Sequence, residues 1–273
     1  MHAVARSARP TAAPASAEPA VRLRGVGKMF DDFRALESID LDFPRGELTT
    51  LLGPSGCGKT TTLKIVAGLM DPTEGEVLVN GQPVTGPGPE RAFVFQDFAL
   101  LPWGTVLRNV AFGLELRGVP KEEREEIARA HVAEVGLVGA EHKYPHELSG
   151  GMRQRVGLAR ALAVNAEILL MDEPFASVDE QNRRKFQEDL LRLLAHEKKT
   201  VIFVTHSIEE AVYISDQVAV LTRNPGRLSR VVRPAIDRSG QFDDLRRTPA
   251  YLDSVDEIWN ELKGYLEDEE AGP

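Results

Sequence analysis

The stretch Leu48-Thr-Thr-Leu-Leu-Gly-Pro-Ser-Gly-Cys-Gly-Lys-Thr-Thr-Thr-Leu63 decides the fold of this chain. Its apolar run, Leu48 to Leu52, predicts a buried strand of a parallel sheet. The residues from Gly53 to Thr60 match the pattern G-x-x-x-x-G-K-[ST], which is typical of a phosphate-binding loop. The apolar spacing from Leu63 to Met70 predicts a helix after the loop. A strand before the loop and a helix after it argue against a Gly-rich turn that matches by chance.

The chemistry of phosphate binding explains the residue types in this loop. Glycines let the backbone bring its N–H groups against phosphate oxygens, and the helix N-terminus adds a positive dipole end. Lys59 supplies a charge for the β- and γ-phosphates, and the Thr60 hydroxyl is suited to ligate Mg²⁺. A helix N-terminus can lower a thiol pKa, so Cys57 is expected to react with thiol reagents unless ATP protects it. The residues expected to contact the nucleotide are Gly53, Pro54, Ser55, Gly56, Cys57, Gly58, Lys59, Thr60 and Thr61.

Length, charge and cysteine content limit the class of protein. The 273 residues are enough for one large α/β domain or for a domain with an appendage. The formal net charge of −9 argues against a protein that binds nucleic acid, because holding nucleic-acid phosphates requires a basic surface. The single cysteine excludes an internal disulfide, and no apolar run approaches the length of a membrane span. Any association with a membrane is therefore expected to go through a partner.

The two ends of the chain differ from its middle. Residues 1–20 are rich in Ala, Pro, Ser and Arg, which predicts a disordered tail, with a transit peptide as the less favoured alternative. Residues 236–273 form a C-terminal extension, in which Thr248 could cap a helix that starts at Pro249. We expect this helix to pack on its own domain, with dimer contact or regulation as alternatives. The apolar residues at helical spacing are Leu252, Val255, Ile258, Trp259, Leu262 and Leu266.

Further strands are predicted along the chain, and the last of them is expected to close the main sheet. They cover Val21–Val26, Ile39–Phe43, Glu76–Val79, Ala92–Phe95, Glu167–Met171, Thr200–Val204 and Gln217–Leu221. Ligands of α/β sheets bind at the carboxyl ends of strands. Asp172 and Glu173 follow one strand, where Asp172 can hold Mg²⁺ and Glu173 can orient or deprotonate an attacking water. Gln96 could offer its amide oxygen to Mg²⁺ or be a plain loop residue, and His206 could bind a γ-phosphate or only cap a helix.

Residues from about 97 to 160 predict a helical subdomain inserted between strands of the main sheet. Its first two helices are predicted over Thr105–Leu114 and Pro120–Val135. Ser149 could cap a third helix whose first turn holds Gly150 and Gly151. Glycines there cost a helix about 1 kcal/mol each. A close backbone approach to an anion is the favoured explanation for them, and a plain N-cap followed by flexible glycines is the alternative.

Several strings in order resemble one family. They are Gly53-Pro-Ser-Gly-Cys-Gly-Lys-Thr60, Gln96, Leu148-Ser-Gly-Gly-Met-Arg-Gln154, Ile168-Leu-Leu-Met-Asp-Glu-Pro174, Ala176-Ser-Val-Asp179 and His206. Their order and spacing are similar to those of an ABC-transporter ATP-binding subunit over about residues 21–235. The Leu-Ser-Gly-Gly string between a Gln and an Asp-Glu pair is the specific part. The resemblance implies an α/β fold: the core sheet of a P-loop NTPase (an ABC ATPase) with a helical subdomain and an antiparallel β subdomain.

The resemblance also implies roles for single residues, with ATP and Mg²⁺ as cofactors. Phe30, which by itself would favour core packing, falls at the family's adenine-stacking aromatic. Ser149 and Gly151 match signature residues that contact the γ-phosphate held by the other protomer, and Gly150 lies between them. Asp179 matches the family's aspartate at the dimer interface, in the segment called the D-loop. The family's usual string there is Ser-Ala-Leu-Asp, whereas this chain has Ala176-Ser-Val-Asp179, so a contact by the D-loop serine is not implied. The implied catalytic residues are Glu173, His206, Gln96 and Lys59, and the implied metal ligands are Thr60, Gln96 and Asp172.

The function that the resemblance implies is that of an ATP-hydrolysing subunit that energises an importer. Phe95-Gln-Asp97, Leu100-Leu-Pro-Trp103 and Arg223-Asn-Pro-Gly-Arg227 look like the nitrate/sulfonate/taurine branch. The implied partners are a second copy or a paralogous cassette, a transmembrane permease and, indirectly, a solute-binding protein. They imply a peripheral position on the cytoplasmic face of the cell membrane. Alternatives are the ATPase of a different transporter or, less favoured, a soluble ABC ATPase of DNA repair or translation. A P-loop kinase or GTPase would not need Ser149-Gly-Gly, and intact Glu173 and His206 argue against a nucleotide sensor that does not hydrolyse ATP.

Overall fold

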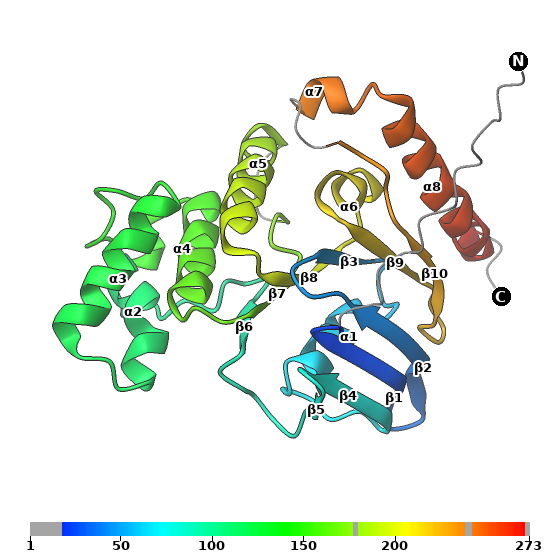
Figure 1. Cartoon of the computed structure of the whole chain (residues 1–273), viewed down its shortest axis with the longest axis horizontal. Coiled ribbons are helices and arrows are strands. Elements are labelled where there is room, and N and C mark those ends of the chain that lie inside the picture. Colours follow the sequence, from blue (N-terminus) through cyan, green and yellow to red (C-terminus); the bar gives the residue numbers. More distant parts are fainter. Residues whose placement is uncertain (1–17, 177–179, 238–241, 271–273) are drawn as a thin grey trace, which may run out of the picture.

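A computed structural model describes residues 18–176, 180–237 and 242–270, which form two sheets, a helical segment and a C-terminal helix (Figure 1). Residues 1–17 of the expected tail lie outside the described residues, and so does Asp179. Ala20 is described and buried, and its N–H donates to the Phe43 carbonyl at 3.0 Å. Among the described residues, no helix combines the length and apolarity needed to cross a membrane.

The main sheet has six strands in the order β10-β9-β3-β8-β7-β6. They are β3 (Leu48–Leu52), β6 (Arg91–Val94), β7 (Ile168–Asp172), β8 (Thr200–Thr205), β9 (Gln217–Leu221) and β10 (Leu228–Val232). All neighbouring pairs are parallel except β9 and β10. Every residue of β3, β7, β8 and β9 is buried, as expected for strands covered on both faces. The expectation that Gln217–Leu221 closes the sheet is wrong, because β10 adds an antiparallel edge strand beyond it.

The second sheet is antiparallel, with strand order β2-β1-β4-β5. Its strands are β1 (Val21–Phe30), β2 (Phe33–Phe43), β4 (Glu74–Val79) and β5 (Gln82–Pro83). The first two strands are longer than predicted, because residues 27–30 and 33–38 extend one hairpin around a turn at Asp31 and Asp32 instead of forming a separate connection. Register shifts along this hairpin break the two-residue alternation that marks a strand in the sequence. The apolar face of the sheet packs with β3 and with α1 (Lys59–Val66) in one buried cluster.

The helical segment consists of three α-helices and one short 3₁₀ turn. They are α2 (Val106–Leu116), α3 (Lys121–Glu134), η1 (Pro145–Glu147) and α4 (Gly150–Ala163). Thr105 caps α2 by accepting from the Arg108 N–H, and Ser149 caps α4 by accepting from the Met152 N–H. Pro120 occupies the N-cap of α3 rather than the expected first helical position. The three α-helices pack on one another away from the antiparallel sheet, and α4 also packs on β6 (Figure 1).

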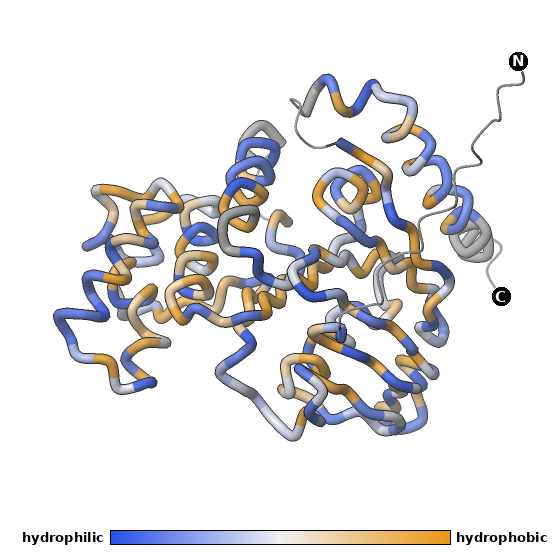
Figure 2. Tube along the Cα trace, viewed as in Figure 1, coloured by the Kyte–Doolittle hydropathy of each residue, from blue (hydrophilic) through white to orange (hydrophobic). Residues whose placement is uncertain are grey.

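The remaining helices are α5 (Glu180–Glu197), α6 (Ile208–Ile214), α7 (Phe242–Leu245) and α8 (Pro249–Glu270). α8 packs on α6, β9 and β10 of its own domain (Figure 1), and Thr248 caps it by accepting from the Tyr251 N–H at 3.3 Å. Hydrophobic and hydrophilic residues alternate along this helix (Figure 2).

The packed face of α8 is rotated from the predicted one. Ile258 and Leu262 are buried as expected, but Leu252 is 50% exposed and Trp259 is 48% exposed. Tyr251 is buried instead, and its hydroxyl donates to the Glu209 carbonyl of α6 at 3.2 Å. This burial raises the pKa of Tyr251 to about 12. The Leu266 side chain lies outside the described residues.

A loop formed by residues 222–227 packs against the phosphate loop. Gly226 donates its N–H to the Ala35 carbonyl at 3.0 Å and accepts from the Glu37 N–H at 2.9 Å. A Cβ atom at Gly226 would lie 2.2 Å from the Cys57 carbonyl oxygen, so only glycine fits. Gly58 has a φ of 90°, and a Cβ there would lie 2.3 Å from Leu36 Cδ2. The phosphate loop is therefore in close contact with β2 and with this distant loop.

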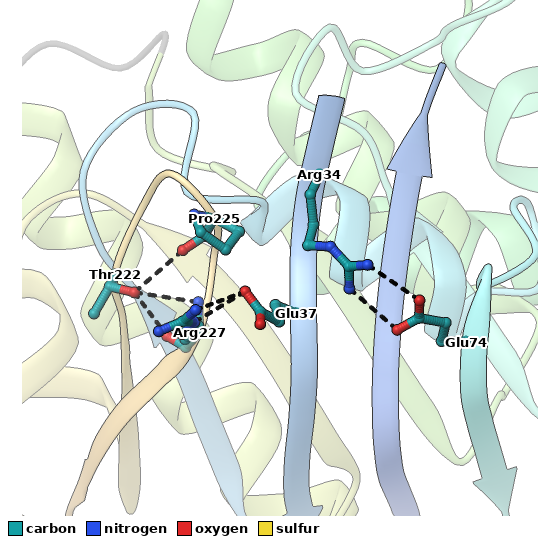
Figure 3. A network of polar contacts seen from close by, with 6 residues as sticks. All are labelled: Arg34, Glu37, Glu74, Thr222, Pro225 and Arg227. Atoms are coloured by element: carbon teal, nitrogen blue, oxygen red, sulfur yellow. Dashed lines mark hydrogen bonds and ion pairs between the residues drawn. The ribbon is translucent and has the colours of Figure 1, made fainter. Parts of the chain in front are cut away.

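Polar contacts hold residues 222–227 in place (Figure 3). The Arg227 N–H donates to Thr222 Oγ1 at 3.2 Å, and the Arg227 guanidinium pairs with Glu37 on β2 at 2.8 Å (Figure 3). Nearby, Arg34 of β2 and Glu74 of β4 make an ion pair with two hydrogen bonds (Figure 3). Because Glu37 also donates its N–H to Gly226, β2 fixes this loop through both its backbone and a side chain.

We predict that Gly226→Ala lowers the free energy of unfolding by about 1–3 kcal/mol, the usual cost of forcing an extra methyl into a packed site. The same change should speed the labelling of Cys57 by a thiol reagent, because the added methyl pushes the Cys57 backbone out of its buried position. Chemical denaturation and thiol titration measure the two effects.

Gly86→Ala is the matched control, since a Cβ at Gly86 meets nothing within 4 Å and its φ is not positive. If Gly226→Ala behaves like this control in both assays, the 222–227 loop does not support the phosphate loop.

Candidate functional site

Four adjacent strands of the main sheet end at the same edge. The phosphate loop follows β3, His206 follows β8, Asp172 ends β7, and Gln96 comes shortly after β6. The strand order β3-β8-β7-β6 and the parallel pairing bring these residues together at the carboxyl edge. Residues more than a hundred positions apart in the sequence therefore lie together in one candidate site.

Lys59 organises the phosphate loop from inside. Its side chain is buried, and Nζ donates to the carbonyls of Gly53 at 2.8 Å and of Pro54 at 3.0 Å. These bonds curl the loop around the ammonium group, and the Cys57 N–H also donates to the Pro54 carbonyl at 3.3 Å. A curled loop at the start of α1 is suited to bind an anion.

The environment of Cys57 differs from the one that the sequence predicts. Its side chain is fully buried, and Sγ lies 3.8 Å from Lys59 Nζ. Burial raises the pKa of the Cys57 thiol more than the Lys59 charge lowers it. The expectation of a depressed pKa at the helix N-terminus is therefore wrong, because desolvation of the thiolate outweighs the favourable field.

Thr60 and Asp172 meet across the site. Thr60 Oγ1 donates to Asp172 Oδ1 at 2.9 Å. Burial raises the pKa of Asp172, the hydrogen bond from Thr60 lowers it, and the Glu173 charge raises it. A hydroxyl and a carboxylate side by side are oxygen ligands that suit Mg²⁺. Within the described ranges, no group of three or more His, Cys, Asp and Glu side chains is placed to hold a metal.

Glu173 and His206 face each other beside this pair. His206 Nδ1 lies 3.5 Å from Glu173 Oε2, and both residues line a small cavity of about 100 Å³. Glu173 has a φ of 44°, and its N–H donates to the Val204 carbonyl at 3.1 Å. A left-handed conformation at a residue other than glycine costs about 1–3 kcal/mol, and such strained residues often cluster at functional sites. The conformation turns the Glu173 side chain toward the end of β8.

Phe30 lies at the end of β1 and is 41% exposed. Lys28 Nζ lies 5.3 Å from the centroid of its ring. Phe30 is therefore not a core residue, which was the alternative from the residue alone. Its exposed ring offers a face on which a base could stack.

Gln96 is exposed, and the segment after it is held by a residue that the sequence did not single out. Phe98 and Ala99 both have positive φ angles. Their carbonyls accept from the Arg160 guanidinium of α4, at 2.6 Å and 2.7 Å. An arginine on a helix gives no sequence signal of such a contact, because its partners are backbone atoms of a distant loop.

Ser149, Gly150 and Gly151 lie at the N-terminus of α4, in the helical segment and not at the strand edge. Ser149 is exposed, and a Cβ at Gly151 would meet nothing within 4 Å. The fold of one chain therefore gives no steric reason for glycine at position 151. This observation favours the approach of something outside the described chain over a packing role.

The comparisons with known proteins agree with this geometry. Residues 36–176 match the ABC transporter family. An uncharacterised ABC transporter ATP-binding protein of Methanocaldococcus jannaschii is 53% identical over 230 residues, which cover 84% of this chain and 85% of the relative. The taurine import ATP-binding protein TauB of Chromobacterium violaceum is 49% identical over 213 residues, which cover 78% of this chain and 82% of the relative.

A solved structure shares the fold as well. It is a dimeric ATP-binding cassette in a post-hydrolysis state, bound to ADP and phosphate, and it matches 81% of this chain and 100% of its own length with a TM-score of 0.70 and 33% identity. The expected α/β fold with its two accessory parts is confirmed. The family match includes the phosphate loop, the start of α4 and the Asp172-Glu173 pair, and this chain therefore belongs to the ABC transporter family of ATP-binding subunits.

Proposed function

We propose that this chain binds and hydrolyses ATP to energise an ABC importer. The observation that carries the proposal is the meeting of three features at one sheet edge: the phosphate loop, the Thr60–Asp172 pair and the Glu173–His206 pair. They supply an anion cradle, oxygen ligands for a metal, and a base beside a possible phosphate ligand. These are the components that phosphoryl transfer to water requires.

ATP is proposed to lie with its phosphates in the loop from Gly53 to Thr61 and its adenine on Phe30. Lys59 contributes its charge at the centre of the curled loop, and the exposed Phe30 ring stacks on the base. Thr60, Asp172 and Gln96 are proposed to hold Mg²⁺, which when bound neutralises charge on the β- and γ-phosphates. Aromatic stacking accepts guanine as well as adenine, so binding of GTP is compatible with this site.

Hydrolysis is proposed to use Glu173 as the general base. Its carboxylate takes a proton from water as the water oxygen attacks the γ-phosphorus and ADP leaves. His206, whose Nδ1 faces Glu173, has its other ring nitrogen available to donate to the γ-phosphate. The left-handed backbone of Glu173 supports this role, because it orients the carboxylate toward the cavity shared with His206.

A second copy, or a paralogous cassette, is proposed to complete each site. Ser149, Gly150 and Gly151 would contact the γ-phosphate bound in the partner's loop, which explains a helix that starts with two glycines and has open space beside Gly151. The dimeric cassette with ADP and phosphate supports this arrangement. Closure around ATP and reopening after hydrolysis would then drive a transmembrane permease.

The remaining partners follow from the branch of the family. The exposed loop after Gln96, with Trp103 67% exposed, offers an apolar surface for a permease. We propose a peripheral position on the cytoplasmic face of the cell membrane, and a solute-binding protein that delivers nitrate, a sulfonate, taurine or a related small solute. The taurine import relative supports this branch. No nucleic-acid partner is proposed, and an ATPase of a different transporter is the alternative.

We propose that the chain consists of an ATP-binding domain and a C-terminal extension. Residues 21–235 form the ATP-binding domain, with residues of about 97–160 as its helical subdomain. Residues 236–273 form an extension whose helix α8 packs on α6.

Glu173→Gln is predicted to reduce ATP turnover by about 10²-fold or more while ATP stays bound, because the amide cannot accept the proton of the attacking water. Phosphate release measures turnover, and equilibrium binding of ATP measures affinity. Lys59→Ala serves as the comparison, since loss of the loop's charge should weaken binding itself. Near-normal turnover in Glu173→Gln would remove this residue from the role of base.

We also predict that ATP hydrolysis by the chain rises several-fold when its cognate permease and solute-loaded binding protein are reconstituted with it. The test purifies the chain with its membrane partner and measures hydrolysis and uptake of labelled taurine, nitrate and alkanesulfonate in vesicles. Hydrolysis that is indifferent to every co-purifying membrane protein would contradict the importer proposal and favour a soluble ATPase.

A further inference from the structure

The two residues that flank His206 take part in a set of hydrogen bonds outside the candidate nucleotide site. The residue before it, Thr205, and the residue after it, Ser207, both line the small cavity that contains Glu173 and His206. Glu210 of α6 lines the same cavity and contacts both of these neighbours. Glu210 therefore contacts the residues on both sides of His206.

Each carboxylate oxygen of Glu210 accepts one hydrogen bond. Oε2 accepts from Thr205 Oγ1 at the end of β8, and Oε1 accepts from Gln187 Nε2 of α5 at 2.9 Å. Thr205 is 3% exposed and Gln187 is 5% exposed, so both donors are buried. Glu210 thus joins the strand that ends at His206 to α5, the helix that begins at Glu180.

The start of α6 has the sequence of a capping box but not its usual bonds. Ser207 Oγ accepts from the Glu210 N–H at 3.3 Å, as in a capping box, but Glu210 does not return the bond to Ser207. Thr205 Oγ1 accepts from the Ser207 N–H at 3.1 Å instead. The Thr205 hydroxyl therefore stands between the helix start and Glu210, which frees the carboxylate to reach Gln187.

This arrangement has a cost that helix capping alone does not explain. Burial raises the pKa of Glu210 above its ordinary value, and the bonds from Thr205 and Gln187, together with the charges of Arg183 and His206, only partly offset the effect. An acid at the third position of an exposed helix start would cap the helix without this desolvation. The burial is explained if the bonds to Thr205 and Gln187 are themselves required.

We propose that Glu210 is a positioning residue for ATP hydrolysis, which aligns His206 with Glu173 by holding the end of β8 against α5. The inference rests on the proposed roles of Glu173 and His206 in hydrolysis. Glu210 acts through Thr205 and the backbone on both sides of His206.

The number of donors and acceptors on the side chain at position 210 predicts the effect of Glu210→Gln on hydrolysis. A carboxylate accepts from two donors at once, whereas an amide offers one acceptor and one donor. In Glu210→Gln both charge-assisted bonds are lost, and the new amide N–H group keeps a partner only if the Gln187 amide turns over to present its oxygen. We expect kcat to fall on the order of 10- to 100-fold, the usual effect of misplacing a catalytic group by about 1 Å, while the affinity for ATP changes less than about threefold.

The chain offers a rescue that a general loss of structure would not show. In Gln187→Glu combined with Glu210→Gln, the new carboxylate at position 187 accepts from the amide at position 210, whose oxygen still accepts from Thr205 Oγ1. The double variant keeps the net charge and is expected to recover most of kcat. Gln187→Glu alone puts two carboxylates together and should impair hydrolysis and stability.

Glu209→Gln is the matched control. It makes the same substitution one residue earlier on the same helix, where the side chain is exposed and pairs with Arg246. Hydrolysis at saturating ATP and Mg²⁺, equilibrium ATP binding and thermal unfolding are measured on the full chain for each variant. The control should keep its kcat and ATP affinity.

A double-mutant cycle with His206→Ala tests the route of the effect. If Glu210 acts through His206, then Glu210→Gln has little further effect on kcat in the His206→Ala background. An equal further loss in that background overturns the proposal. So does a folded Glu210→Gln variant with kcat within threefold of the original, or a folded double variant without recovery.

These outcomes are distinct from failure of the proposed function. A chain that does not hydrolyse ATP refutes the proposed activity before any variant is compared. Unchanged turnover in His206→Ala refutes the assigned role of His206, and it also refutes the proposal that Glu210 positions His206.

Discussion

The tight curl of the phosphate loop is the physical constraint on which the rest of this structure depends. A loop that curls this tightly must exclude side chains where it meets its surroundings, which is why Leu36 occupies the space beside Gly58 and Gly226 lies against Cys57. Lys59 holds the curl from inside. The antiparallel sheet, the main sheet and the loop after β9 therefore all contact one short segment, and Arg227 and Glu37 hold the most distant of these contacts (Figure 3).

The parallel sheet adds the polar groups that the loop lacks. Its carboxyl edge collects Asp172, Glu173 and His206 from different parts of the chain. The arrangement works against stability, since burial raises the pKa values of Asp172 and Glu210 and Glu173 adopts a left-handed backbone. Such local costs are typical of sites in which function, not stability, selects the geometry.

Helix α4 connects the helical segment to the sheet edge through two arginines. Arg160 donates to the carbonyls of Phe98 and Ala99, just after Gln96. Arg155 donates to the Val135 carbonyl and pairs with Asp189 of α5. The helix that begins with Ser149 therefore contacts both the segment after Gln96 and α5, which carries Gln187. The groups proposed to meet a partner's ATP are joined in this way to the groups proposed to hydrolyse the chain's own ATP.

The sequence by itself determined the phosphate loop, most strands of the main sheet, the Ser149 cap and the acids after β7, because local patterns of glycine, apolar residues and caps specify these features. It missed β10 and the hairpin tip near Phe30, where register shifts break the alternation, and it misjudged the packed face of α8. Only the tertiary structure decided the pKa of Cys57, the exposure of Phe30, and the contacts of Gly226, Arg160 and Glu210. Burial and long-range hydrogen bonds depend on which distant segments meet, and no local pattern records that.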